Sequence, residues 1–199
     1  MRDLLVFKAK RRTVVTVTAV VAALLAGALA VTLLTSGAGN ASSDTVSGNT
    51  VEYQAGHRPL APDLAGSSLT GAPIKLASYR GKTVVLNFWG SWCSPCRGEA
   101  PVLALLDQQY GQKGVAFLGD DVGDTPANAL AFTRSAGIAY PSINDQGYAV
   151  VQRLAQVVPV SDTPTTVVID KTGHVAATVI GAVNYGEMVT LLRDAAVTQ

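Results

Sequence analysis

Short apolar runs alternate with longer helix-like segments over the second half of the chain, and this alternation predicts an α/β domain. Residues 83–88 (TVVLNF) and 115–119 (VAFLG) are compact apolar runs of the kind that forms buried strands. Between them, residues 94–113 have a helical pattern, with Gly111 and Gly114 near the end. A strand, a helix and a strand in this order predict a βαβ unit with parallel strands and a right-handed crossover.

Further helices and a hairpin are predicted downstream. Thr125 is suited to the N-cap of a helix, Pro126 to its first position and Gly137 to its end, so residues 125–138 predict a helix. The remaining pattern predicts a short helix near residues 147–155, strands at 165–170 and 174–181 around the turn KTG, and a last helix from about Tyr185 to Ala196. Together these elements predict a mixed central sheet with helices on both faces.

The first forty residues have a different character. Residues 1–12 carry five Lys and Arg against one Asp, and the 22 residues 13–34 carry no charge. The uncharged run is longer than a signal-peptide core of about 7–15 residues and reaches the roughly 20 residues that span a bilayer. We therefore expect a transmembrane anchor, with the basic tip in the cytoplasm and the rest of the chain outside. Cleavage after Ala41, which would release a secreted protein, is the alternative.

A polar segment separates the apolar run from the domain. Residues 35–58 are rich in Gly, Ser, Thr, Asn and Ala and predict a flexible linker, while residues 59–197 have the length of one domain. Outside the basic tip the chain carries 10 Lys and Arg against 13 Asp and Glu. A nucleic-acid-binding protein would have a basic surface, so the charge argues against that class.

Candidate chemistry lies in residues 87–101 (NFWGSWCSPCRGEAP), which hold the only two cysteines, Cys93 and Cys96. Two thiols leave no separate disulfide framework, and a zinc site would need ligands from His57 and His174, which lie 36 residues before and 78 after the pair. Two inert buried cysteines would not explain the Gly, Ser and Pro around them. A dithiol that cycles with its disulfide is therefore favoured, and no metal or other cofactor is expected.

The motif and its surroundings resemble the thioredoxin superfamily. FWGSWCSPC follows a predicted strand at the start of a predicted helix, and DTPTTVVID lies about seventy residues later. The extra residues 59–82 and the helical insertion at 125–137 resemble in particular the membrane-tethered TlpA-like and ResA-like thiol-disulfide oxidoreductases. The resemblance covers residues 59–197 and implies a thioredoxin-like fold with an N-terminal hairpin extension and a helical insertion.

The resemblance also implies a function. Such a protein exchanges disulfides with exported proteins on the extracytoplasmic side of the membrane, and a membrane-embedded electron donor is expected. The family's best-known setting is cytochrome c maturation, with apocytochrome c as a partner. The resemblance favours the reducing direction, whereas the dipeptide Ser94-Pro95 between the cysteines is compatible with either direction.

The position of the motif predicts a role for each residue. At the start of a helix, unpaired amides and the helix dipole stabilise the thiolate of Cys93, which makes it the attacking sulfur. Cys96 lies one turn later and is expected to be more buried and to resolve the mixed disulfide. Pro95 restrains the turn, Trp92 is expected to shape the exposed rim, and Trp89 is expected to be a core residue.

The resemblance also implies roles for residues outside the cysteine motif, around Pro164 and around Glu99. Pro164 matches the superfamily's cis-proline that faces the two cysteines, where the preceding residue, Thr163, offers its backbone to substrate. Asn87 stands where ordinary thioredoxins carry a buried aspartate, and Glu99 matches an acid of the ResA-like group. Glu99 is therefore expected to be a partly buried carboxylate that exchanges a proton with Cys96, with a solvated helix residue as the alternative.

The remaining acids and two other functions complete the sequence analysis. Asp120, Asp121 and Asp124 follow an apolar run and are interpreted as a polar loop, with a cation site as the alternative. A peroxiredoxin-like peroxidase would need PxxxTxxC, but Leu86 and Gly90 occupy the Pro and Thr positions. A tethered non-enzymatic binding module would have no use for a dithiol at a helix start.

Overall fold

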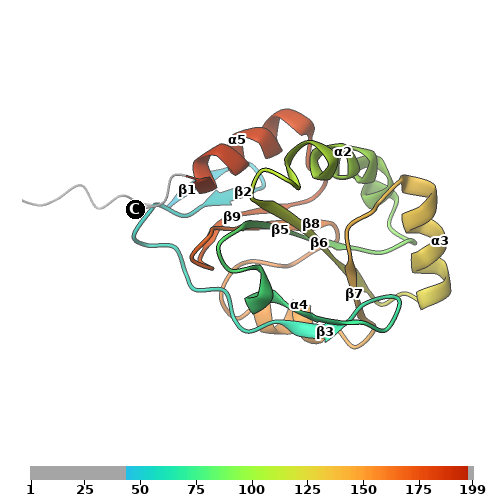
Figure 1. The fold of residues 1–199 in the computed structure, drawn as a ribbon. Helices are drawn as coiled ribbons and strands as arrows, with labels where there is room; N and C mark the ends of the chain where they lie inside the picture. The colour runs from blue at the N-terminus through green and yellow to red at the C-terminus, as the bar shows by residue number, and fades with distance from the viewer. Residues whose placement is uncertain (1–43, 197–199) are drawn as a thin grey trace, which may run out of the picture. The chain divides into compact units, whose positions relative to one another are not determined.

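A mixed sheet of seven strands runs through residues 44–196, which are the residues that this computed structural model describes (Figure 1). Its strands are β1 (Thr45–Ser47), β2 (Thr50–Glu52), β5 (Thr83–Trp89), β6 (Val115–Val122), β7 (Ser142–Asp145), β8 (Thr165–Ile169) and β9 (Val175–Ile180). Their order in the sheet is β1-β2-β9-β8-β5-β6-β7. β5, β6 and β7 run parallel, whereas the other neighbours run antiparallel.

Helices and a small hairpin cover both faces of this sheet. They are the hairpin β3 (Ala65–Ser67) and β4 (Pro73–Lys75), the 3-10 helix η1 (Leu76–Tyr79), and the α-helices α2 (Ser94–Tyr110), α3 (Pro126–Ala136), α4 (Ala149–Leu154) and α5 (Tyr185–Ala196). Figure 1 shows α2 and α5 over one face and α4 with β3 over the other. The mixed sheet with helices on both faces, predicted from the hydrophobic pattern, is confirmed.

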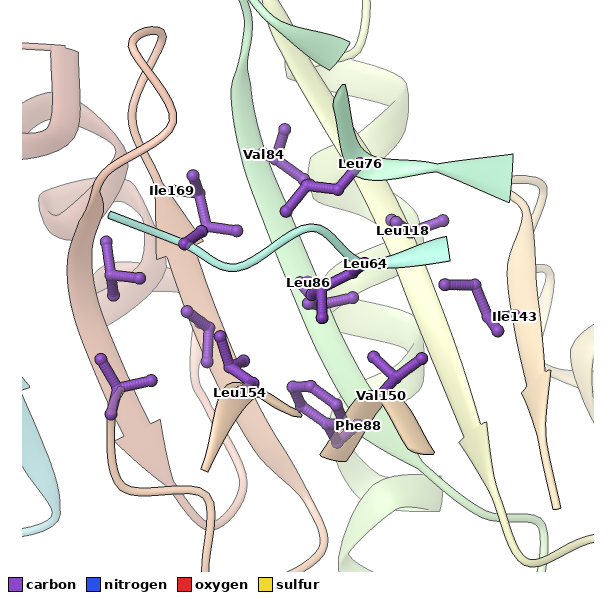
Figure 2. Packing of buried hydrophobic residues seen from close by; sticks show 14 of the residues in the cluster. Leu64, Leu76, Val84, Leu86, Phe88, Leu118, Ile143, Val150, Leu154 and Ile169 are labelled. Atoms are coloured by element: carbon purple, nitrogen blue, oxygen red, sulfur yellow. The ribbon is translucent and has the colours of Figure 1, made fainter. Parts of the chain in front are cut away.

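The central strand β5 divides its side chains between two cores. All seven of its residues are buried, because it has a partner strand on each side and packed layers on both faces. Figure 2 shows Val84, Leu86 and Phe88 facing the layer that holds Leu64 and Leu76. On the other face, Val85 packs in the cluster with residues of α2 and α5, and Trp89 packs against Phe132 of α3. Packing on both faces of the sheet therefore fixes the end of β5, from which the chain continues into α2.

The structure differs from the sequence-based boundary at residues 45–52. These residues were assigned to a flexible linker, but they form β1 and β2, and β2 pairs antiparallel with β9. The prediction of a linker through residue 58 is therefore wrong for residues 45–52. Strand pairing is made by backbone groups, so a polar composition does not prevent it. Arg58 adds a side-chain contact, because its guanidinium lies 3.1 Å from the Asp170 carboxylate.

The predicted basic tip and membrane anchor, residues 1–34, lie outside the described residues. Within residues 44–196, no helix combines the length and the apolar character needed to cross a membrane.

We predict that Gly66 is required where β3 approaches β7. A Cβ atom on Gly66 would lie 2.5 Å from Cγ2 of Ile143, whose side chain is only 2% exposed. We expect Gly66→Ala to lower the free energy of unfolding by about 1–3 kcal/mol, because a tightly packed core resists extra atoms. Gly147→Ala is the control, since no heavy atom lies within 4 Å of its Cβ position. Equal denaturant midpoints for the two variants would contradict this interpretation.

Candidate active site

Cys93 and Cys96 form a disulfide across the first turn of α2. Cys93 is the N-cap residue, and its sulfur accepts a hydrogen bond of 3.2 Å from the backbone amide of Cys96. Pro95 lies in the first turn, where its missing N–H leaves no intrahelical hydrogen bond unmade. The sulfur of Cys93 therefore lies at the positive end of the helix dipole, as the sequence predicted.

The two sulfurs differ in their access to solvent. Cys93 is 4% exposed and Cys96 is 1% exposed, so the order of burial agrees with the sequence prediction. Pro95 is exposed beside Cys93, and the indole of Trp92 is 55% exposed. Both cysteines are therefore buried, and exposed side chains adjoin the less buried one, Cys93.

The Thr163–Pro164 peptide bond is cis, as the resemblance implied. The carbonyl oxygen of Thr163 lies 3.6 Å from the sulfur of Cys93. Pro164 is buried at the start of β8, and its carbonyl accepts a hydrogen bond from Gly181. Residues 70 positions apart in the sequence thus meet at the reactive sulfur.

Glu99 is fully buried rather than partly buried, with 2% of its surface exposed. One carboxylate oxygen accepts a hydrogen bond of 2.8 Å from the side chain of Asn87 on β5. The other accepts one of 2.9 Å from the backbone amide of Val183, which precedes α5. The interpretation of Glu99 as a solvated helix residue is wrong, because the helix presents this position to the sheet along with Cys96.

Burial changes the acidity of Glu99. It raises the pKa of this carboxyl group from 4.5 to about 7, although the hydrogen bonds from Val183 and Asn87 oppose the rise. The group therefore exchanges protons near neutral pH. It lies three residues after Cys96, and both residues are on the buried face of α2.

Sequence reasoning missed two partners of this acid network. Thr166 accepts a hydrogen bond of 3.0 Å from Asn87, and the amide of Val183 binds Glu99. The signal for Thr166 was its place two residues after Pro164 on a predicted strand, because β8 pairs with β5 and brings Thr166 opposite Asn87. No sequence signal identified Val183, because a backbone amide leaves no trace in the residue type.

The two tryptophans have different environments. Trp89 is 1% exposed and packs against Phe132 of α3, with ring centroids 5.0 Å apart, so it is a core residue as predicted. The exposed Trp92 donates a hydrogen bond of 3.2 Å from Nε1 to the carbonyl of Val122. Gly90 lies directly beside this indole, because a Cβ atom there would meet Nε1 at 2.5 Å.

The three acids after residue 119 do not form the predicted polar loop. β6 extends to Val122, so Asp120 and Asp121 are strand residues with no measurable exposure. Burial and the nearby Asp145 charge raise the pKa of Asp120 to about 9, while burial and Asp124 raise the pKa of Asp121 to about 7. Within residues 44–196, no three His, Cys, Asp or Glu side chains are placed to hold a metal ion.

The histidines lie apart from the cysteines. His57 is exposed ahead of the first core residues, and His174 lies in the turn between β8 and β9, where its ring is 2.8 Å from the hydroxyl of Thr172.

Comparison with known proteins gives consistent matches. Residues 58–178 match the AhpC/TSA family. The thiol-disulfide oxidoreductase ResA of Geobacillus thermodenitrificans is 38% identical over 121 residues, which cover 61% of this chain and 67% of that protein. ResA of Bacillus subtilis is 33% identical, with coverage of 61% and 65%.

Two solved structures resemble this chain in both fold and sequence. A DsbF homologue from Corynebacterium diphtheriae is 33% identical with a TM-score of 0.68, covering 76% of this chain and 98% of that one. A secreted thiol-disulfide isomerase from Corynebacterium glutamicum is 30% identical with a TM-score of 0.70, covering 77% and 98%.

We predict that Glu99 makes stability depend on pH. In the unfolded chain Glu99 ionises above about pH 4.5, whereas in the fold it keeps its proton up to about pH 7, so the fold loses stability as the pH rises between these values. The unfolding free energy of the wild type, relative to that of Glu99→Gln, is expected to fall by about 1–3 kcal/mol over this range. Denaturant titrations at a series of pH values measure this difference.

Glu187→Gln is the control for this measurement. Glu187 lies in the first turn of α5 and accepts a hydrogen bond from Thr50. A constant difference between wild type and Glu99→Gln across the range would show that Glu99 keeps an ordinary pKa in the fold.

Proposed function

This chain belongs to the AhpC/TSA family, and from that starting point we propose that its Cys93–Cys96 pair reduces disulfides in exported proteins. It is a thiol-disulfide oxidoreductase with a thioredoxin-like fold. The observation that carries the proposal is the disulfide at the start of α2, which lies against the cis Thr163–Pro164 peptide.

Exchange begins from the reduced pair. The Cys93 thiolate attacks a target disulfide, a mixed disulfide forms, and the first target sulfur leaves as a thiolate. Cys96 then loses its proton and attacks the sulfur of Cys93, which releases the second target sulfur and closes the Cys93–Cys96 disulfide. The dithiol loses two electrons and the target gains them, leaving as two thiolates that take protons from solvent, while the one proton lost by Cys96 passes to an acceptor.

Glu99 is the proton acceptor for the second step in this proposal. Its burial, its pKa of about 7 and its place three residues after Cys96 support the role. Asn87 cannot ionise, so it holds the carboxylate rather than sharing the proton. On reduction of the pair by an electron donor, Glu99 returns the proton to Cys96.

The substrate site in this proposal consists of Trp92, Pro95, Thr163 and Pro164. Trp92 and Pro95 are exposed next to Cys93 in the chain, and the carbonyl oxygen of Thr163 lies 3.6 Å from its sulfur. An extended segment of a partner protein would lie between them, with its cysteine at Cys93. This arrangement favours polypeptide substrates, because the backbone of Thr163 and the exposed Trp92 and Pro95 can contact an extended chain.

Acidic groups near the pair support the reducing direction. A carboxylate disfavours a nearby thiolate, and a dithiol whose reduced form is less stable is a stronger reductant. Glu99 lies on α2 with Cys96, and the carboxylate of Asp124 accepts a hydrogen bond from the amide of Ser91, two residues before Cys93.

The setting of this activity belongs to the proposal as well. We place the domain on the extracytoplasmic side, tethered by residues 13–34, with a membrane-embedded electron donor and apocytochrome c among the partners. The secreted relative from Corynebacterium glutamicum supports the location. A peroxidase role is disfavoured, because Leu86, at the position of the required proline, is a fully buried core residue of β5.

We predict that Cys96→Ser traps partner proteins. The mixed disulfide at Cys93 then has no second thiol within reach, so partners stay covalently attached until reductant is added. Cys93→Ser is the matched control and is expected to trap almost nothing, because Cys96 is 1% exposed. Electrophoresis without reductant followed by mass spectrometry identifies the partners. Equal trapping by the two variants would exclude this mechanism.

We predict that Glu99→Gln slows exchange by about tenfold or more, because a positioned proton acceptor typically contributes at least that much. In the wild type the exchange rate is expected to change with pH near pH 7, where Glu99 titrates, and this pH dependence is expected to disappear in the variant. Stopped-flow reduction of a peptide disulfide between pH 5 and 9 measures the profile, with Glu187→Gln as control. An unchanged profile would reduce Glu99 to a structural group.

A further inference from the structure

The backbone just before the reactive cysteine is held from both sides. The amide of Ser91 donates a hydrogen bond of 2.9 Å to the carboxylate of Asp124. The carbonyl of the same residue accepts hydrogen bonds of 2.9 and 2.6 Å from the guanidinium of Arg97 on α2. Ser91 lies two residues before Cys93, so these contacts fix the direction from which the chain enters the active site.

Asp124 belongs to a different part of the fold from the cysteines. It lies between β6 and α3, and its second oxygen accepts a hydrogen bond of 2.8 Å from the amide of Thr125, the N-cap residue of α3. The neighbouring Val122 carbonyl binds the indole of Trp92. Residues 122–124 therefore hold two consecutive residues, Ser91 and Trp92, ahead of Cys93.

Gly123 makes this double contact possible. Its φ of +65° lies in the left-handed region, which residues other than glycine rarely adopt. The chain thus turns between Val122 and Asp124, so that a carbonyl and a carboxylate both reach the segment before Cys93.

Asp124 carries a negative charge at neutral pH. The residue is 7% exposed, and burial alone would raise its pKa, but hydrogen bonds from Ser91, Thr125 and Asn128 outweigh burial and lower it. This charged carboxylate binds the amide of Ser91, two residues before the attacking sulfur. Charges interact more strongly where water is excluded.

We propose that Asp124 is a positioning residue for Cys93: its carboxylate fixes the Ser91–Cys93 segment, and its charge keeps the Cys93 thiolate less stable than the helix amides alone would make it. The proposal rests on thiol–disulfide exchange at Cys93. Other charged residues on the segments that adjoin the pair include Arg97 and Glu99 on α2, Asp121 on β6 and Asp162 before Thr163.

Two substitutions separate charge from position. Asp124→Asn keeps an oxygen that can accept from Ser91 but removes the charge, whereas Asp124→Ala removes both. In the reduced full-length chain, Asp124→Asn is expected to raise the thiolate fraction of Cys93 at low pH by about three- to tenfold and to make the reduction potential less negative. Asp124→Ala is expected to add a fall in kcat/KM for a protein disulfide, because the segment is no longer held.

The measurements are the pH dependence of Cys93 alkylation by iodoacetamide and equilibration with glutathione. Asp170→Asn is the matched control. Asp170 is 5% exposed, its pKa is lowered despite burial by hydrogen bonds from Thr172, His174 and Arg58, and it lies at the end of β8 away from Pro164. It is expected to lower the melting temperature without moving the alkylation profile or the potential.

The outcomes are distinct. The role of Asp124 would be overturned if Asp124→Asn kept the alkylation profile and the reduction potential of the wild type. It would also be overturned if Asp170→Asn shifted both quantities as much as Asp124→Asn does. Failure of the proposed function is separate, because it requires that wild-type Cys93 itself does not exchange with disulfides.

Discussion

The buried carboxylate of Glu99 is the contact on which the active site depends. It ties α2, which carries both cysteines, to the centre of the sheet through Asn87 and to the start of α5 through the amide of Val183. Two hydrogen-bond donors from separate segments make the burial of an acid tolerable, and the remaining desolvation leaves its pKa near neutrality. The group that fixes the helix is thus also one that can carry a proton.

Environment gives the acids around the dithiol different states. Glu99 receives two hydrogen bonds deep in the core and titrates near neutral pH, whereas Asp124 receives enough donors to stay ionised. The environments of the two cysteines also differ. The first turn of α2 leaves Cys93 beside the exposed Trp92, whereas Cys96 is the more buried of the two. Acid and base roles that follow from burial rather than residue type are a general feature of catalytic sites.

Local signals in the sequence predicted most of what forms the site. The cysteine spacing, the caps of α3 and the strand runs all act within a few residues, so their outcome can be inferred from residue types. The cis Thr163–Pro164 bond was expected from the family resemblance instead. Long-range backbone contacts could not be predicted: the pairing of β2 with β9 placed residues 45–52 in the sheet, and the Val183 amide completed the Glu99 site. The extension of β6 through Asp120 and Asp121 was missed because two adjacent carboxylates are unusual in a buried strand.

The account depends most on Glu99 holding a proton near neutral pH inside the fold. Carbon-13 NMR of the glutamate side-chain carboxyl groups, with Glu99→Gln used to assign the resonance, reports this titration directly. The account predicts a midpoint of about 7 for Glu99 in the oxidised protein. A midpoint at its ordinary value of 4.5 would contradict the account, because the carboxylate would then be too weak a base to hold the proton of Cys96 near neutral pH and return it on reduction.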